Sequence, residues 1–308
     1  MRFGPYLGSG AATRSDLIER AVAAEELGFD SVWMGDHIII PKQFDRDRYP
    51  YRSGLGGGFP STADVAWYES ISALCFLAGV TTKVKLGLST LVVPYRNPIL
   101  AAKMMSTLDV LSEGRLVLGV GTGWMKEEYD ALKTAPYEDR GAVTDEYIEI
   151  FIELWTQENP TYNGKHYQVS GIGFLPKPVQ RPHPEIWVGG HTGRAFKRLA
   201  KYGQGWQPHM LSPDDIAAKQ PSLKRYFAEQ GRDLSEIETA VSARLEFTDT
   251  PSSDKRLPLT GTSVQILDDI RRYQEVGVTE IRFSGTASTA GAMIEIWKRF
   301  AQEIKPKV

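Results

Sequence analysis

The chain has 308 residues, of which 42% are hydrophobic and 24% are charged, and its formal net charge is −2. This composition is typical of a globular protein with a large core, and the small net charge argues against a nucleic acid or an anionic membrane surface as partner. No segment reaches the ~18 consecutive apolar residues of a membrane span, and the first residues lack the apolar run of a secretory signal. We therefore expect a cytoplasmic protein whose single cysteine, Cys75, forms no internal disulfide and packs in the core.

Strand-like and helix-like segments alternate along the chain. Short apolar runs predict buried strands, and apolar residues at helical spacing predict the helices between them. The expected strands are Arg2–Leu7, Asp30–Met34, Val84–Val93, Arg115–Val120, Glu185–Val188, 204–207, 237–247 and Glu280–Phe283. The expected helices are Ser15–Leu27, 65–79, 97–112, 140–157, Thr192–Tyr202, 213–230, 262–276 and Ala287–Ile304.

This alternation determines the fold class that we predict. Repeated strand–helix units require parallel strands that are covered by helices. About eight such units in roughly 300 residues favour a closed (β/α)8 TIM barrel over an open, doubly wound sheet. We find no linker between the segments, and we predict a single α/β domain over residues 1–308.

Two segments interrupt the alternation. Residues 40–62 form a long polar stretch, rich in glycine and aromatic residues, which predicts a lid or a binding loop. Residues 160–182 follow the fourth helix and predict an insertion. Its first part reads as a hairpin that turns at Asn163–Gly164, and its second part, within LPKPVQRPHP, is proline-rich and is expected to be extended.

Glycines cluster where the fourth expected strand ends. Gly119, Gly121 and Gly123 stand in the sequence GVGTGW, directly before charged, helix-like residues. A Rossmann dinucleotide site needs G-x-G-x-x-G after the first strand and an acidic residue about 20 positions later, and this chain lacks that arrangement. Two interpretations remain open: a tight turn between strand and loop, or a floor of bare backbone beneath a planar cofactor ring.

Polar residues and glycines also follow other strands. Asp36 and His37 come directly after the second strand, and Ser89 and Thr90 lie near the end of the third. Gly189–Gly193 leads from the fifth strand into a helix, whose N-terminus is a candidate phosphate site. The carboxyl ends of barrel strands meet at one end, so we expect one cofactor site there, with His37 as the proton donor or acceptor. The alternative for Asp36 and His37 is an ordinary capping role.

The helix after Gly193 carries a stripe of basic residues. Arg194, Lys197, Arg198 and Lys201 recur at helical spacing and therefore share one face. The stripe is either a solvated surface or a strip that receives the acidic tail of a cofactor. The histidines of the chain show no paired spacing of a metal site, so no metal is expected.

Four longer motifs carry a resemblance to a known family. They are AEELGFDSVWMGDHIIIP (24–41), VKLGLSTLVVPYRNPILAAKMMSTLDVLSEGRLVLGVGTGW (84–124), RGAVTDEYIEIFIELW (140–155) and LPKPVQRPHPEIWVGGHTGRAFKRLAKYGQGW (175–206). In combination they resemble the luciferase-like monooxygenase superfamily, whose barrels use a flavin or a deazaflavin. The resemblance implies a TIM barrel with an insertion, and a non-prolyl cis peptide bond beneath the cofactor ring, which by motif position is Ser89–Thr90.

The resemblance also implies the residues of the site. Asp36 and His37 fall where deazaflavin-dependent members contact the ring and place a catalytic histidine. Gly189–Gly193 would hold the cofactor phosphate, and the remaining residues would approach the ring or its ribityl chain. The expected cofactor-binding residues are Asp36, His37, Ser89, Thr90, Val92, Thr122, Gly123, Gly189, Gly190, His191, Thr192 and Gly193, with His37 as the catalytic residue.

One departure from the superfamily bears on the substrate. Its deazaflavin-dependent glucose-6-phosphate dehydrogenases carry a glutamate directly after the GTG element, where this chain has Trp124. A sugar phosphate is therefore not the expected substrate, and Trp124 with Trp67 predicts a pocket for a small apolar or planar organic molecule. Trp33, Tyr68 and Trp206 either extend this apolar wall or belong to the core.

Two cofactors compete for the site. We predict reduced coenzyme F420, a 5-deazaflavin that would exchange a hydride with the substrate while His37 supplies the proton. The alternative is an FMN-dependent monooxygenase that uses reduced FMN and oxygen in a pocket closed to water. A third interpretation is a non-catalytic flavin-binding barrel, which the candidate proton donor disfavours. Because relatives commonly pair through helices on one side of the barrel, the resemblance also implies a homodimer.

Overall fold

The computed structural model describes all residues except 9–12, 44–62, 64, 254, 286 and 288, so most of the expected lid, residues 44–62, lies outside the described residues. Eight parallel strands form its central sheet, in the order β1-β12-β9-β8-β7-β4-β3-β2. They are β1 Arg2–Pro5, β2 Ser31–Met34, β3 Lys85–Val92, β4 Leu116–Gly121, β7 Ile186–Gly189, β8 Gly205–Gln207, β9 Glu238–Arg244 and β12 Glu280–Ser284. A parallel bridge between Tyr6 and Trp33 brings the two edges together, which confirms the predicted TIM barrel.

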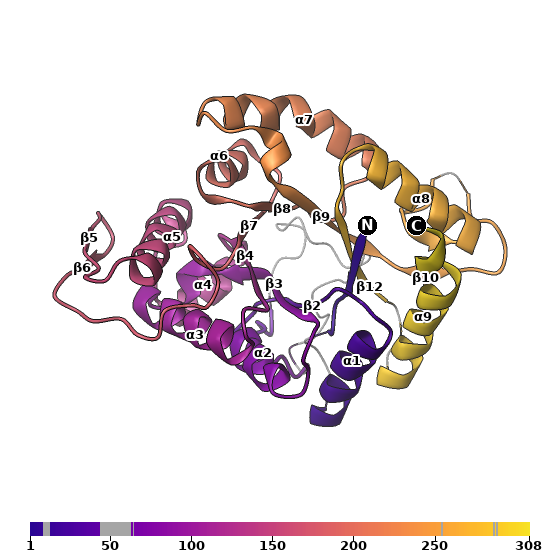
Figure 1. The fold of residues 1–308 in the computed structure, drawn as a ribbon, viewed down its shortest axis with the longest axis horizontal. Coiled ribbons are helices and arrows are strands. Elements are labelled where there is room, and N and C mark those ends of the chain that lie inside the picture. The colour runs from indigo at the N-terminus through magenta and orange to yellow at the C-terminus, as the bar shows by residue number, and fades with distance from the viewer. Residues whose placement is uncertain (9–12, 44–62, 64, 254, 286, 288) are drawn as a thin grey trace.

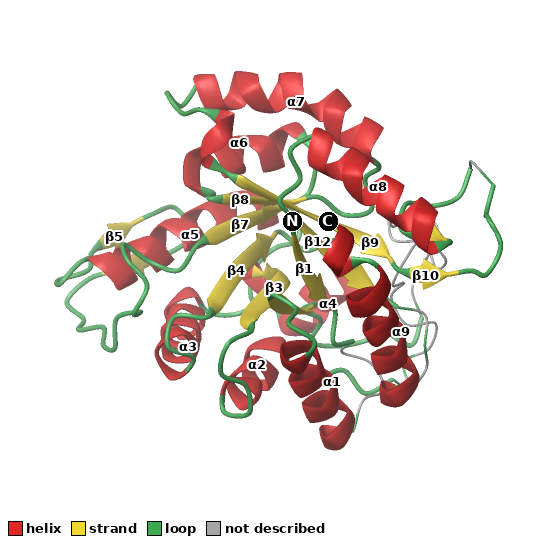
Figure 2. Ribbon diagram, turned by 45° about the vertical axis from the view of Figure 1, so that its right-hand side comes forward, coloured by secondary structure: helices red, strands yellow, loops and turns green. Residues whose placement is uncertain are grey.

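Helices surround the barrel on its outer face (Figures 1 and 2). They are α1 Arg14–Glu26, α2 Ser70–Ala78, α3 Pro98–Leu111, α5 Arg140–Thr156, α6 Gly193–Tyr202, α7 Pro213–Ala228, α8 Ser263–Glu275 and α9 Ala290–Glu303, with the short α4 Lys126–Leu132 after β4. Most of the apolar side chains form one core cluster between the sheet and these helices. Among the described helices, none has both the length and the apolar character that a membrane crossing requires.

Side-chain caps explain where two helices begin later than the sequence pattern predicts. The carboxylate of Glu69 accepts a hydrogen bond from the backbone N–H of Ser72 (2.6 Å), so α2 starts directly after Glu69 instead of near residue 65. The hydroxyl of Thr289 accepts from the N–H of Ala292 (3.2 Å), and α9 starts directly after it instead of near residue 287. In both helices the first residue is determined by the polar capping side chain and not by the spacing of the apolar residues.

The interior of the barrel is filled by tryptophan. The rings of Trp33 and Trp187 lie with their centroids 6.0 Å apart inside the strands, and both side chains are buried. A Cβ atom at Gly87 would overlap Trp33, and one at Gly205 would overlap Trp187, so bare backbone on the facing strands makes room for the two rings. Trp33 is therefore a core residue, and any ligand site must lie at an end of the barrel.

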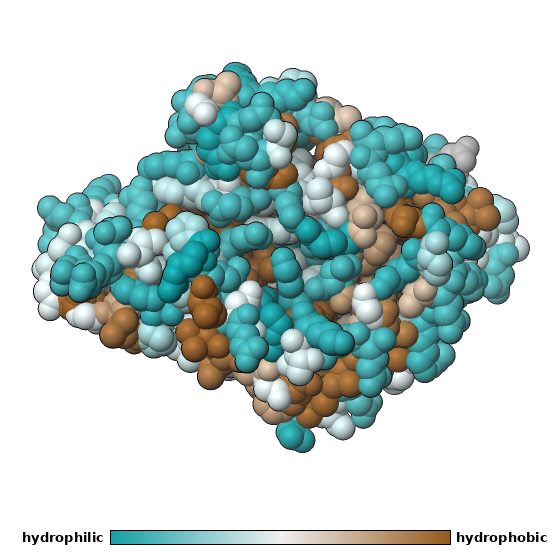
Figure 3. All heavy atoms as spheres, viewed as in Figure 1, coloured by the Kyte–Doolittle hydropathy of each residue, from teal (hydrophilic) through white to brown (hydrophobic). Residues whose placement is uncertain are grey.

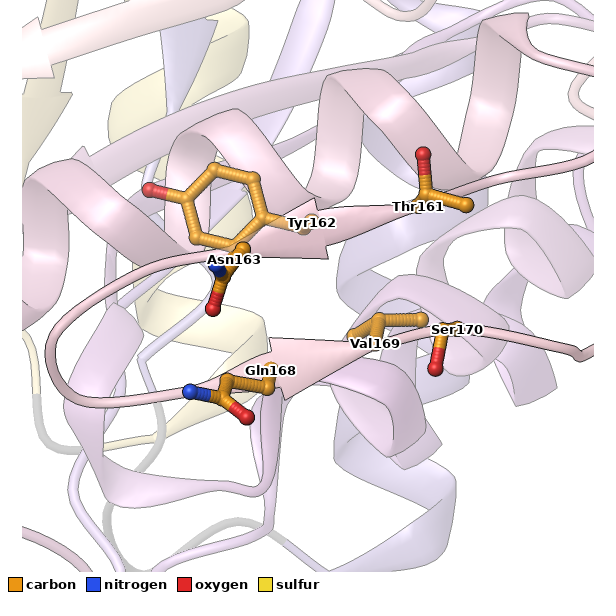
Figure 4. A pocket seen from close by; sticks show the side chains of 6 residues that line it. All are labelled: Thr161, Tyr162, Asn163, Gln168, Val169 and Ser170. Carbon is orange, nitrogen blue, oxygen red and sulfur yellow. The ribbon is translucent and has the colours of Figure 1, made fainter.

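The insertion after α5 forms the expected hairpin. Its strands, β5 Tyr162–Asn163 and β6 Gln168–Val169, pair antiparallel, and the N–H of Gly164 donates to the carbonyl of Tyr167 (3.0 Å). A second short pair, β10 Glu246–Phe247 with β11 Thr260–Gly261, lies beside β9 in the chain. The hairpin also lines a concavity, together with Thr161 and Ser170 (Figure 4). The side chains that line this concavity carry no charge, and the hairpin lies beside α5 at the left of Figure 1.

Candidate active site

The predicted site segments come together at one end of the barrel. In the sheet, β4 lies between β3 and β7, and β2 lies on the other side of β3, so the carboxyl ends of these four strands are neighbours. Thr90 links three of them: a Cβ atom at Gly121 would overlap its hydroxyl, and one at Gly189 would lie 2.7 Å from its methyl group. The peptide bond Ser89–Thr90 is cis, as the resemblance implies.

The glycines of β4 accommodate the irregular end of β3. The register between the two strands shifts between Leu88 and Leu91. A Cβ atom at Gly119 would overlap the carbonyl oxygen of Leu88, and Gly123, at φ +66°, would place one 2.6 Å from Val92. The glycine run is therefore required first by the neighbouring strand. These positions carry no side chains because the bulge of β3 occupies the space, and this holds with or without a cofactor ring at the same place.

His37 is held by a carboxylate that the sequence analysis did not select. Its Nδ1 lies 2.7 Å from Oε2 of Glu128, which is fully buried on α4. The hydroxyl of Tyr95 donates to the same oxygen (2.8 Å), and the backbone N–H of Ile38 donates to Oε1 (2.9 Å). Burial, with Glu128 adding to it, raises the pKa of Tyr95 far above its ordinary value, so Tyr95 stays a hydrogen-bond donor. Glu128 therefore fixes the position of the imidazole.

The two tryptophans of the predicted substrate pocket lie against the same imidazole. The ring centroid of His37 is 5.3 Å from that of Trp67 and 5.6 Å from that of Trp124, both edge to face. Trp67 precedes α2 and Trp124 follows β4, so two distant segments enclose His37. The arrangement gives the histidine an aromatic environment on two sides, and the substrate pocket and the role of His37 as proton donor stay predictions.

Asp36 is engaged in a buried ion pair. Its carboxylate, in a residue that is 3% exposed, accepts from both terminal nitrogens of Arg96 (2.7 and 2.8 Å), from the Ser70 hydroxyl (2.9 Å) and from the N–H of Val92 (2.9 Å). Arg96 also donates to Glu69 (2.5 Å) at the start of α2. These bonds tie the ends of β2 and β3 to α2. They describe a structural role for Asp36, and its direct contact with a cofactor stays a prediction.

A polar layer lies inside the barrel beneath Ser89. The Ser89 Oγ is 2.5 Å from the hydroxyl of Tyr6, and it also accepts a short hydrogen bond from Arg282 of β12. Arg282 is 1% exposed, and burial lowers the pKa of its guanidinium. The neighbouring side chain of Gln207 is buried with its Oε1 unpartnered in the described structure. Such a polar, charged layer directly below the strand ends is suited to a polar ring above it.

A second histidine, His209, stands after β8 at the same end. Its Nδ1 is 2.7 Å from the hydroxyl of Ser242 on β9. Burial first, then Arg282 and His191, lower the pKa of His209 to about 4, so its imidazole is neutral at pH 7. The sequence analysis did not select His209, and the electrostatic effect of Arg282 on it arises only from the fold.

The predicted phosphate loop keeps a conformation suited to an anion. Gly190 has φ +98°, and its carbonyl accepts a hydrogen bond from the indole N–H of Trp206 (2.7 Å). Thr192 caps α6 by accepting from the N–H of Ala195 (3.4 Å), and the helix begins at Gly193. Trp206 is thus a buried support for this loop and not part of an open apolar wall.

Comparisons with known proteins agree with this architecture. Residues 1–257 match the model of the family described as luciferase-like monooxygenase. An F420-dependent glucose-6-phosphate dehydrogenase of Amycolatopsis mediterranei is 33% identical over 241 residues, which cover 75% of this chain and 65% of the relative. An FMNH2-dependent dimethylsulfone monooxygenase of Pseudomonas putida is 34% identical over 141 residues, which cover 45% of this chain and 38% of the relative.

A solved structure shares the whole fold. The F420-dependent secondary alcohol dehydrogenase in complex with an F420–acetone adduct superposes with a TM-score of 0.78, and the match covers 98% of each chain. Its sequence is 18% identical to this chain, so the likeness concerns the barrel and its insertions. The similar proteins therefore include two that are named as F420-dependent and one that is named as FMNH2-dependent.

Proposed function

This chain belongs to the luciferase-like monooxygenase family of oxidoreductases, and from that premise we propose that it uses F420 for hydride transfer with a small apolar or planar organic substrate. The reduced cofactor gives a hydride to the substrate, and in the reverse reaction the oxidised cofactor accepts one from it. One observation carries the proposal: His37 is oriented by a buried carboxylate and enclosed by Trp67 and Trp124 at the carboxyl end of the barrel. This is an acid–base group beside an apolar surface, which suits reduction of a carbonyl or activated double bond, or the reverse reaction.

The residues present fit a flat ring that ends in a phosphate. Ser89 and Thr90, with the buried polar layer below them, would support the ring, and Val92, Thr122 and Gly123 would approach its side. The loop Gly189–Gly193 opens α6 and would bind the phosphate through backbone N–H groups and the helix dipole. Residues of four strand ends would therefore share the cofactor.

The bound deazaflavin supplies hydride chemistry at its ring carbon 5. The protein's part is to hold the proton. Because an ionised carboxylate only accepts hydrogen bonds, Glu128 keeps the proton of His37 on Nδ1, and Nε2 exchanges a proton with the substrate oxygen or carbon. Trp67 and Trp124 exclude water and orient the substrate against the imidazole.

Titration of the purified protein tests the choice of cofactor. Because Trp67 and Trp124 flank the site, binding of a flat chromophore should quench tryptophan fluorescence. We expect saturable quenching by F420 with a Kd on the order of micromolar, as is usual for cofactors and substrates of enzymes. FMN should give none in the same range. Binding of FMN with no binding of F420 would contradict the proposal.

The FMN-dependent monooxygenase remains the second candidate. The Pseudomonas putida relative uses FMNH2, and its matched segment covers nearly half of this chain. The apolar enclosure of His37 also suits a reaction that water must not enter. The same titration, carried out with reduced FMN in the absence of oxygen, decides between the candidates, because a monooxygenase of this kind must bind FMNH2.

We also propose that the chain forms a homodimer through α2 and α3. Exposed large hydrophobic side chains in the described residues gather there and on the adjacent proline-rich segment: Phe76, Val80, Leu100, Val110, Leu111, Leu175 and Val179. The segment lies along α3, since Asp109 accepts from the N–H of Val179 (2.7 Å), and Figure 3 shows apolar surface over this part of the molecule. The exposed fractions correspond to on the order of 600 Å² of apolar surface, enough for the apolar part of a ~800 Å² face of a dimer.

A matched pair of variants tests this interface. Leu100 is 55% exposed near the start of α3, and Val264 is 76% exposed near the start of α8, away from the apolar face. Glutamate is tolerated at either helix start, but Leu100→Glu would bury a charge in the dimer. By sedimentation equilibrium we expect dimers for the wild type and Val264→Glu and monomers for Leu100→Glu. A monomeric wild type, or a dimeric Leu100→Glu, would contradict this interface.

A further inference from the structure

The fold divides the basic stripe of α6 into two halves. Arg198 donates to Asp145 (2.6 Å) and to the carbonyl of Gly141 (3.0 Å), and Lys201 donates to Glu149 (2.8 Å). These acceptors belong to α5, so the half of the stripe that faces α5 is paired with its carboxylates. That half of the stripe holds two helices together and has its charge already compensated.

The other half of the stripe is Arg194 and Lys197, and Lys197 faces α7. Arg194 and Lys197 are exposed, and the salt bridges of the described residues pair neither with a carboxylate. The Nζ of Lys197 lies 6.0 Å from the centroid of the Tyr226 ring, which belongs to α7. A Cβ atom at Gly193 would lie 2.8 Å from the Tyr226 hydroxyl, so this hydroxyl stands at the N-terminus of α6. The edge of α6 and α7 thus adjoins the phosphate loop.

A further cation of α7 stands at this edge. Burial lowers the pKa of His191, and Lys219 lowers it further, which places the Lys219 charge beside the phosphate loop. Asp215 raises the pKa of His191, against the effect of Lys219. At the start of α7, its carboxylate also accepts a hydrogen bond from the hydroxyl of Ser212 (2.7 Å), the residue that caps the helix. Hydrogen bonds from Ser212 lower the pKa of Asp215, so this carboxylate keeps its negative charge, and Arg194, Lys197 and Lys219 outnumber it on the side of α7.

We propose that the edge formed by Arg194, Lys197, Lys219 and the Tyr226 hydroxyl binds an anionic chain of carboxylates that continues beyond the cofactor phosphate. The inference rests on the proposed function, because F420 carries such an oligoglutamate tail and FMN ends at its phosphate. The uncompensated charges direct the tail along α7, since the cations facing α5 are paired. The edge would then select F420 over FMN at a distance from the ring.

Two double variants with the same change in net charge test whether the tail binds along this edge, which we call the tail route. Lys197→Gln/Lys219→Gln removes charge from the proposed edge, and Lys201→Gln/Lys298→Gln removes it from lysines paired with Glu149 and Glu295. We expect the first to weaken F420 binding by about 3- to 10-fold at low ionic strength, the loss of two exposed charge contacts. Affinity for the deazaflavin phosphate without glutamates should stay within about 2-fold, because the phosphate loop is intact.

The control double variant should bind both ligands like the wild type. The loss in the edge variant should also shrink at ~0.5 M NaCl, because salt screens exposed charges. Equal weakening by both double variants, or equal weakening for both ligands, would overturn the tail route. F420 binding at wild-type strength in the edge variant would overturn the tail route alone. If the wild-type protein does not bind F420, the proposed function is wrong and the tail route with it.

Discussion

Replacing His37 with alanine should lower kcat by roughly 10²- to 10⁴-fold, the contribution typical of a side chain that transfers a proton in the rate-limiting step. The reason lies in its surroundings: the carboxylate of Glu128 orients the imidazole at Nδ1, and Trp67 and Trp124 pack against the ring. The Kd for F420 should change by less than about 3-fold, because the phosphate loop and strand ends are untouched. Steady-state turnover and fluorescence titration measure the two quantities separately.

A second histidine provides the contrasting variant. His191 is an exposed residue of the phosphate loop, between Gly190 and Thr192. His191→Ala should therefore weaken cofactor binding more than it lowers kcat at saturating cofactor. If His37→Ala turns over at the wild-type rate, or if the two variants show the same pattern, the assignment of His37 as proton donor is wrong.

The fold could be predicted because its signals are local and repeated. Most strands of the barrel are short and largely apolar, and most are followed by a helix with its own side-chain cap, so small errors at the boundaries do not change the topology. The insertion hairpin was also predictable from Asn163–Gly164, although its turn extends over Gly164 to Tyr167. What local patterns cannot supply is which side chains from different segments touch.

Glu128 and Arg282 show this limit. Glu128 stands in an ordinary amphipathic stretch, and its role arises because α4 folds back over His37, 91 residues earlier in the chain. Arg282 had a detectable signal: it stands between Ile281 and Phe283, whose side chains pack in the outer core, so its own side chain had to point into the barrel. Glu280, two residues earlier, lies on the same inward face and is buried too. A charge on the inward face of a buried strand is a candidate functional residue.

The glycine run at the end of β4 has a steric cause in the neighbouring strand, and its role beneath a cofactor ring stays a prediction. Gly121 leaves room for the Thr90 side chain, and Gly119 for the backbone of Leu88, so the turn geometry is real. Because these glycines have no side chains, they also leave backbone uncovered at the carboxyl end of the barrel, where the site residues meet. Sequence alone offered these as alternatives, because the bulge of β3 that requires the glycines lies about 30 residues away in the chain.

Glu128→Gln should lower kcat by on the order of 10²-fold and reduce the free energy of unfolding by about 1–3 kcal/mol. Glutamine keeps the shape and can still accept the N–H of Ile38, but its amide nitrogen would replace Oε2, which faces the Nδ1 of His37 and the hydroxyl of Tyr95. His37 must then turn its Nδ1 lone pair toward the amide, which moves the ring proton to Nε2. In the oxidation direction its Nε2 could then not accept a proton from the substrate, and in the reduction direction the negative charge that stabilises the protonated imidazole would be missing.

Tyr95→Phe is the matched control for Glu128. It removes one of the donors to the same carboxylate (2.8 Å) while the contact of Glu128 with His37 remains. We expect a loss of about 1 kcal/mol in denaturant unfolding and a kcat within a few-fold of the wild type. In the Gln variant, kcat should fall while KM and the Kd for cofactor change little, which a general loss of structure would not produce. Wild-type turnover in Glu128→Gln, or equal losses of kcat in both variants, would show that Glu128 only stabilises the fold and does not orient His37 for proton transfer.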